Sequence, residues 1–251
     1  MGPGKGVSLP FVLGLQIYAI NPIASNIFAF FSAMEPIRNI IFDLGGVLYN
    51  IDYHATLDAF KNMGIRDFDR LFNQAAQNDL FDRFDRGAVS PEGFRAEIRS
   101  LTGLDLSDQQ IDDAWNAMLL DFPPHRIDLL EGLRSHYRLF LLSNTNAINF
   151  PVFQKHMKEN FGFEDIDPFF EKTYLSYRIG HRKPEREAYE LILRENELVG
   201  EQTLFVDDTL QHVEGARRAG LKAVWLNLEQ MEVTDLFNWH YQLRPEVADL
   251  L

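Results

Sequence analysis

Acidic, hydroxyl and lysine side chains follow short apolar runs in this sequence and are the groups best suited to chemistry. The positions are Asp43 with Leu44, Gly45 and Gly46 after the run IIF, Ser143-Asn144-Thr145 after the run at 137–142, Lys183 within GHRKPE, and Asp207-Asp208 after TLFV. A strand that ends on a carboxylate and a Gly-Gly step suggests a ligand there. The two glycines allow the backbone to approach a phosphate closely, with N–H groups directed at its oxygens.

The chemistry of these side chains is consistent with phosphoryl transfer. The Asp43 carboxylate can attack phosphorus and form an aspartyl-phosphate, which divides one difficult step into two. Because it repels a phosphate dianion, a divalent cation and a lysine are needed nearby. Mg²⁺ suits Asp43 together with Asp207 or Asp208, since it prefers hard oxygen ligands. Ser143 can hydrogen-bond the phosphate oxygens, and Lys183 can stabilise the charge of the transition state.

Short runs rich in branched and aromatic residues predict the strands that position these groups. They are residues 37–43, 137–143, 203–208 and 221–227, with a weaker run at 171–176. The runs are nearly continuous, as in parallel strands buried on both faces. Helical patterns separate the later runs: one is expected to start at or after Pro151, the next has Pro184 in its first turn, and a third ends at Gly220. This order predicts a doubly wound α/β parallel sheet, with ligands beyond the carboxyl ends of its strands.

Residues 52–122 contain only helical patterns, far more than one crossover between strands needs. The patterns are YHATLDAFKNMG, DFDRLFNQAAQ, SPEGFRAEIRSLTG and SDQQIDDAWNAMLLDF. Ser90 and Ser107 are suitable N-caps for the last two. We therefore expect an all-helical cap at 52–122, inserted into an α/β core made of 37–51 and 123–251.

Composition limits the partners. Lysine and arginine number 24 against 37 acidic residues, and the net charge of −13 argues against nucleic-acid binding.

Residues 1–36 are expected to be an extension that is non-native or disordered, with Met34 opening the functional chain. A secretory signal is the alternative for their apolar run, although no clear small-x-small cleavage site follows. Polar and proline residues interrupt the run and disfavour a membrane span. We expect a cytoplasmic monomer or homodimer.

Segments of the chain resemble, in order, the motifs of the haloacid dehalogenase-like (HAD) superfamily: IIFDLGGVL, LFLLSNTN, GHRKPE and LFVDDT. The resemblance extends over residues 37–227 and includes the inserted cap. FDRGAVSPEGF, LSNTN and RKPE are most similar to the bacterial glucose-1-phosphate phosphatases and the phosphatase domain of soluble epoxide hydrolase. The resemblance implies a Rossmann-like core and Mg²⁺-dependent hydrolysis of a small phosphorylated metabolite, a sugar phosphate such as an aldose 1-phosphate.

The resemblance also implies roles for individual residues. Asp43 would be the nucleophile and a Mg²⁺ ligand, the Gly45 carbonyl a second ligand, and Asp208 a third. Asp207 would either bind the metal directly or contact the residues that bind it. The residues expected to bind the substrate are Leu44, Gly45, Ser143, Asn144 and Lys183, and Lys183 would also neutralise the phosphate.

Two positions depart from the pattern of this superfamily. Most of its phosphatases carry a second aspartate two residues after the nucleophile as general acid, and this chain has Gly45 there. The glucose-1-phosphate branch is similar in this respect. The glycine predicts slow turnover of poor leaving groups, because general acid catalysis typically contributes ~10²–10⁴-fold. His212 stands where this branch commonly has Asn or Asp; it either titrates near the metal or caps local structure, and we prefer the second interpretation.

Two other functions remain open. A 2-haloacid dehalogenase also uses an aspartate nucleophile but needs no metal, and Gly45 together with the acidic pair 207–208 counts against it. A degenerate HAD fold that binds a phosphorylated ligand without turning it over is supported by Gly45 and His212. Cap residues would set the identity of the substrate, and sequence alone does not place them.

Overall fold

The computed structural model describes residues 1–2, 36–65 and 79–251. The chain divides into two units, Met1–Glu35 and Pro36–Leu251, and the second contains the fold described below. The predicted extension at 1–36 falls, apart from its ends, outside the described residues, as does the predicted helix DFDRLFNQAAQ. No helix in the described ranges is long and apolar enough to cross a bilayer.

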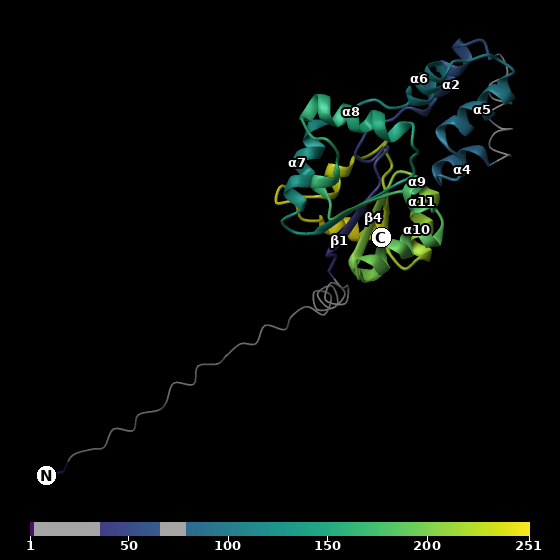
Figure 1. Cartoon of the computed structure of the whole chain (residues 1–251). Helices are drawn as coiled ribbons and strands as arrows, with labels where there is room; N and C mark the ends of the chain where they lie inside the picture. The colour runs from purple at the N-terminus through teal and green to yellow at the C-terminus, as the bar shows by residue number, and fades with distance from the viewer. Residues whose placement is uncertain (3–35, 66–78) are drawn as a thin grey trace. The chain divides into compact units, whose positions relative to one another are not determined.

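A parallel sheet forms the centre of this unit, in the order β3-β2-β1-β4-β5 (Figure 1). Its strands are β1 (Asn39–Phe42), β2 (Arg138–Ser143), β3 (Lys172–Leu175), β4 (Thr203–Asp207) and β5 (Lys222–Trp225). Each strand lies within a predicted run, and the predicted doubly wound α/β fold is confirmed. Because β1 lies between β2 and β4, the residues that follow these three strands meet at one edge of the sheet.

Helices cover both faces of the sheet. They are α7 (Pro124–Leu133), α8 (Asn149–Phe161), α10 (Arg186–Glu195) and α11 (Leu210–Arg218), and the short α9 (Ser176–Ile179) follows β3. Ile40 and Phe42 of β1 pack with α7 and α8, whereas Ile41 packs with α10 and α11. Burial on both faces explains why the strands are continuously apolar in sequence.

The predicted starts of two helices are wrong by two residues. Helix α8 begins at Asn149, before Pro151, because Asn146 Oδ1 accepts hydrogen bonds from the N–H groups of residues 148 and 149. A proline is tolerated in the first turn, where its missing N–H has no helical partner. Helix α10 begins at Arg186 rather than at Pro184. Lys183, the residue before Pro184, forms two main-chain hydrogen bonds with the Asn144 side chain. These bonds keep the segment outside the helix.

The cap helices have a hydrophobic core of their own. They are α2 (Tyr53–Asn62), α4 (Leu80–Asp85), α5 (Pro91–Thr102) and α6 (Asp108–Asn116), and Figure 1 shows them grouped beyond the sheet. Phe84 stacks on Phe94 at its centre, and Trp115 packs against Phe94 with its ring tilted. The predicted N-caps are confirmed: Ser90 Oγ accepts from Gly93 N at 3.2 Å, and Ser107 forms a complete capping box.

Helix α11 approaches the Lys183 segment so closely that no side chain fits between them. A Cβ on Gly215 would lie 2.7 Å from the Pro184 carbonyl oxygen and 2.9 Å from the Pro184 Cβ. The missing side chain at Gly215 therefore determines where the buried Lys183 segment rests.

We predict that Gly215→Ala lowers the free energy of unfolding by about 1–2 kcal/mol. Because the new Cβ would meet a backbone oxygen, overpacking against Pro184 should cost about 2–3 kcal/mol, and the helix propensity of alanine offsets about 1 kcal/mol of it. Glu214→Ala is the matched control on the exposed face of α11, with an expected change within about 0.5 kcal/mol. Urea denaturation measures both variants, and a Gly215→Ala variant as stable as wild type would contradict the packing argument.

Candidate active site

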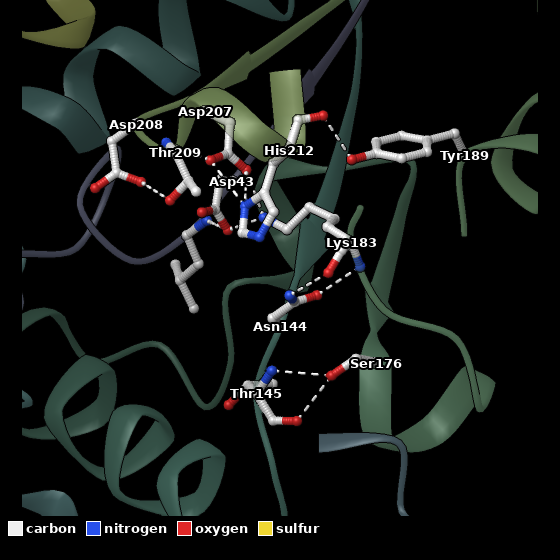
Figure 2. A network of polar contacts seen from close by, with 11 residues as sticks. Asp43, Asn144, Thr145, Ser176, Lys183, Tyr189, Asp207, Asp208, Thr209 and His212 are labelled. Atoms are coloured by element: carbon white, nitrogen blue, oxygen red, sulfur yellow. Dashed lines mark hydrogen bonds and ion pairs between the residues drawn. The ribbon is translucent and has the colours of Figure 1, made fainter. Parts of the chain in front are cut away.

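A buried lysine joins the ends of two neighbouring strands (Figure 2). Lys183 has no exposed surface, and its Nζ lies 2.6 Å from Asp43 Oδ1 and 2.7 Å from Asp207 Oδ2. Asp43 follows β1 and Asp207 ends β4, so paired strands deliver the two carboxylates. The structure thus brings together three residues that the sequence singles out from three separate segments.

The charges of this group do not balance. Burial raises the pKa of Asp43 well above its usual value, and Lys183 offsets this only in part. Burial also opposes ionisation of Asp207, but Lys183 and His212 hold its pKa at about 2. The pKa of Asp208 is raised by burial and by the charge of Asp207. Among the described residues, these three carboxylates thus share the one cation in direct contact with them, and oxygen ligands with surplus negative charge fit a hard divalent cation such as Mg²⁺.

Asp208 differs from Asp207 in its surroundings. Its Oδ1 accepts from Thr209 Oγ1 at 3.3 Å, and in Figure 2 the Asp208 carboxylate lies apart from the Asp43–Lys183 contact. A Cβ on Gly46 would collide with the Asp208 carboxylate, and the φ of Gly46 is +81°. Position 46 therefore requires glycine for two reasons: the backbone has a positive φ, and the Asp208 carboxylate occupies the place of a side chain.

His212 lies beside the carboxylates rather than capping a helix. Its Nδ1 is 3.0 and 3.1 Å from the two oxygens of Asp207, and burial lowers its pKa. One ligand-type atom from each of Asp43, Asp207 and His212 lies within 4.8 Å of the others. Because a carboxylate accepts, we assign the proton of the neutral imidazole to Nδ1, which leaves Nε2 as an acceptor.

The segment after β2 shapes the next part of the site. The Asn144 side chain bonds both the main-chain N–H and the carbonyl of Lys183 at 2.9 Å. Thr145 exchanges hydrogen bonds with the buried Ser176 hydroxyl, which ties this segment to the end of β3. Ser143 is buried and lines the cavity described next, and no described residue hydrogen-bonds its Oγ.

A cavity of about 480 Å³ opens between these strand ends and the cap. Polar groups on its wall include Asp43, Ser143, Asn144, Asn146, Asn149, Asp85, Arg182 and His212. Its apolar wall includes Ile51, Leu57, Phe81, Trp115, Met118, Leu119, Phe150 and Phe153. Trp115 is buried, and its Nε1 has no hydrogen-bond partner among the described residues. The cavity therefore combines an apolar surface with a few convergent polar groups, as ligand sites do.

Ion pairs and amide contacts hold the cap over the cavity. Asn146 Nδ2 donates to Asp85 Oδ1 at 3.2 Å, and Arg182 Nη2 lies 3.7 Å from Asp85 Oδ2. Arg182 also pairs with Asp82, and Arg86 of the cap pairs with Glu185 of the core. Asp85 on the cap side lines the cavity, and Arg182 on the core side directly precedes Lys183 in the chain. Both partners of this contact therefore lie next to the site.

Sequence reasoning placed some of these residues and missed others. The predicted Leu44, Gly45, Ser143 and Asn144 line the cavity, and Lys183 and Asp207 lie beneath it. The prediction did not include Asp85, Arg182 or Trp115. A signal for Asp85 was present, because it lies within the phrase FDRGAVSPEGF that carries the family resemblance, but nothing in the sequence showed which way its side chain points.

Comparison with known proteins agrees with this geometry. The haloacid dehalogenase-like hydrolase family matches residues 37–220. The D-ribitol-5-phosphate phosphatase of Bacteroides thetaiotaomicron is 30% identical over 188 residues, covering 74% of this chain and 90% of the relative. A sesquiterpene phosphatase of Aspergillus oryzae is 26% identical over 188 residues, covering 74% of this chain and 88% of the relative.

A solved structure extends the comparison to three dimensions. The crystal structure of a HAD-family enzyme from Bacteroides thetaiotaomicron, in complex with magnesium and inorganic phosphate, is similar with a TM-score of 0.71 and 34% identity. The match covers 80% of this chain and 100% of that one. The family match spans the cap and every strand end that contributes to the site. This chain belongs to the haloacid dehalogenase-like hydrolase family.

Proposed function

We propose that this hydrolase is a Mg²⁺-dependent phosphatase of a small phosphorylated metabolite, a sugar or sugar-alcohol phosphate, and that it acts through an aspartyl-phosphate on Asp43. The observation that carries the proposal is the buried Lys183 held between Asp43 and Asp207 next to the cavity. A nucleophilic carboxylate can approach a phosphate dianion only where positive charge is fixed beforehand, and this contact fixes it.

The contacts of Asp43 distinguish its two oxygens. Oδ1 accepts from the Leu44 N–H at 2.7 Å and faces Lys183 Nζ. Neither contact falls on Oδ2, so we assign Oδ2 as the atom that attacks phosphorus. The same contacts restrict rotation of the carboxylate, which positions the nucleophile before the substrate binds.

The phosphate would be held by groups at the ends of β1 and β2. Ser143 lines the cavity, and its Oγ would donate to a phosphate oxygen. The Asn144 side chain is engaged with Lys183, so its contact to phosphate would come from the main-chain N–H. Gly45 presents no side chain and would contribute backbone groups to the same site. Mg²⁺, held by Asp43, the Gly45 carbonyl and Asp207 or Asp208, would offset the surplus negative charge and polarise the phosphoryl group.

The wall of the cavity supports a polyol as leaving group. Sugars and sugar alcohols offer C–H surfaces to aromatic side chains and hydroxyl groups to polar ones. Phe81 and Trp115 supply the first, and polar side chains on the same wall, Asp85 and His212 among them, supply the second. The ribitol 5-phosphate named for one relative and the aldose 1-phosphate expected from sequence both have this character. The apolar wall makes a phosphorylated isoprenoid alcohol the second candidate, consistent with the second relative.

Phosphate release from a panel of esters tests the proposal. The panel contains ribitol 5-phosphate, glucose 1-phosphate, farnesyl phosphate and p-nitrophenyl phosphate, each with Mg²⁺ and with EDTA. We expect release from at least one ester, dependent on Mg²⁺, and reduced on the order of 10³-fold or more in Asp43→Asn, as loss of a nucleophile does in other hydrolases. Asp58→Asn, an exposed cap residue outside the cavity, is the matched control and should retain full activity.

Other outcomes of this panel separate the alternatives. Activity that survives both EDTA and Asp43→Asn would refute the proposal. Metal-independent release of halide from 2-chloropropionate would instead favour the dehalogenase. Binding of phosphate esters without any release would favour the degenerate fold.

We also predict that Lys183→Met lowers the free energy of unfolding by about 3–5 kcal/mol at pH 7.5 in EDTA, because it leaves two buried carboxylates without their cation. The loss should be smaller at pH 5. Burial already raises the pKa of Asp43, and loss of Lys183 raises it further. A carboxyl whose pKa is higher in the folded than in the unfolded protein costs stability as pH rises through the folded value, so protonation at low pH relieves the variant.

Urea denaturation at the two pH values measures this difference. Lys172→Met is the control, because Lys172 forms an exposed pair with Glu195 and should change stability by no more than about 1 kcal/mol. An equal deficit at pH 5 and 7.5 would show that Lys183 does not act through the charges of the two carboxylates.

A further inference from the structure

The proposed reaction needs a proton for its leaving group, and the strand ends do not supply one. When Asp43 attacks phosphorus, cleavage of the ester bond in an alkyl phosphate leaves the electron pair on an alkoxide. That strong base departs slowly unless an acid protonates it in the transition state. Gly45, at the mouth of the site, has no side chain to do so. The acid must come from elsewhere in the cavity, and this argument rests on the proposed phosphatase function.

Most titratable side chains on the described wall are unsuited to the task. The set is Asp43, Tyr49, Tyr53, Asp85, Arg182 and His212. Asp43 is the nucleophile. Burial raises the pKa of both tyrosines above the usual value of a phenol, which makes them weaker acids. Arg182 does not release its proton. His212 directs its Nδ1 proton to Asp207, so the imidazole nitrogen left over accepts rather than donates.

We propose that Asp85, from cap helix α4, is the acid that protonates the leaving oxygen. Its side chain is 18% accessible and lines the same cavity as Asp43 and Ser143. The Asn146 amide donates to its Oδ1 at 3.2 Å. Asn146 lies three residues after Ser143, so this bond ties the acid to the segment that would hold the phosphate.

The surroundings of Asp85 suit a proton donor near neutral pH. Burial raises its pKa to about 6, although Arg182 and Asn146 oppose the rise, and Asp82 on the same helix adds to it. From α2, Tyr53 lines the same cavity, and the charge of Asp85 is among the causes that raise the pKa of its phenol. After donation, the Asp85 carboxylate keeps Arg182 Nη2 at 3.7 Å, so the charge it acquires is paired.

The proton balance closes over the full reaction. Asp43 Oδ2 forms a bond to phosphorus, the ester P–O bond breaks, and the leaving oxygen takes the proton of Asp85 to give the alcohol. In the second half, water adds to phosphorus, the bond to Asp43 breaks, and Asp85 takes the proton that water loses. Asp43 and Asp85 both return to their starting states, with inorganic phosphate as the product.

The test compares two leaving groups in wild type and Asp85→Asn. The substrates are ribitol 5-phosphate, or the alkyl ester that wild type hydrolyses best, and p-nitrophenyl phosphate, whose phenolate departs without a proton. We expect Asp85→Asn to lose about 10²-fold or more in kcat/KM on the alkyl ester and only a few-fold on the aryl ester. Asp82→Asn is the matched control, since Asp82 pairs with Arg182 from the same helix but does not line the cavity. Because Asp82 also helps to raise the pKa of Asp85, the control should keep the alkyl-to-aryl ratio of wild type at low pH, where Asp85 is protonated in both proteins.

Each outcome decides between the inference and the function on which it rests. An equal loss on both esters, or no loss on either, overturns the role of Asp85 while the phosphatase stands. Wild type that releases no phosphate from any ester overturns the phosphatase, and the inference with it. Inorganic phosphate binding to Asp85→Asn in the presence of Mg²⁺, measured by calorimetry, shows that the variant is folded.

A second measurement uses wild type alone and does not depend on a variant. The ratio of kcat/KM for the alkyl ester to that for the aryl ester removes the pH effects that both substrates share, including those of the nucleophile and the metal. Because Asp85 must be protonated to act, this ratio should be constant at low pH and fall about tenfold per pH unit above the Asp85 pKa. A ratio that is independent of pH from 5 to 8 would overturn the inference.

Discussion

The contact of Lys183 with Asp43 and Asp207 is the interaction on which the rest of the structure depends. A lysine without exposed surface is costly unless its charge is paired, and here two carboxylates from adjacent strands pair it. The parallel register of β1 and β4 brings those carboxylates to the same level, and the Asn144 side chain holds the lysine main chain. The arrangement still has more negative than positive charge, which is why it suits both a divalent cation and an anionic substrate.

The cap completes a site that the core alone leaves open. In the proposed reaction the core would supply the nucleophile, the fixed cation and groups for the phosphate, but it presents little surface for the rest of a substrate. Trp115 and Phe81 supply that surface, and Asp85 brings a carboxyl group into the same cavity. Arg182 links the two parts, because it pairs with the cap and is the neighbour of Lys183. Cap position and the chemistry below it are thus physically connected.

The core could be predicted from sequence because the patterns that indicate buried parallel strands are local in the sequence. Buried parallel strands are continuously apolar, and their carboxyl ends meet at one edge, so Asp43, Ser143 and Asp207 could be placed together before any coordinates. The cap could be predicted only as helices. Which side of a short helix faces a cavity depends on tertiary packing, and Asp85 and Asp82 stand one turn apart in a similar sequence context. The contact between His212 and Asp207 also arises from the fold, since the two residues are five positions apart, one at a strand end and the other in the first turn of a helix.

The most direct test of the account is a search for phosphate on Asp43 during a single turnover. Excess enzyme with Mg²⁺ is mixed with a ³²P-labelled ester that it hydrolyses, quenched in acid at successive times, digested and mapped by mass spectrometry. The account predicts a label on the peptide containing Asp43 that appears before inorganic phosphate and then decays. Release of labelled phosphate at full rate, with no label on Asp43 at any time, would contradict it.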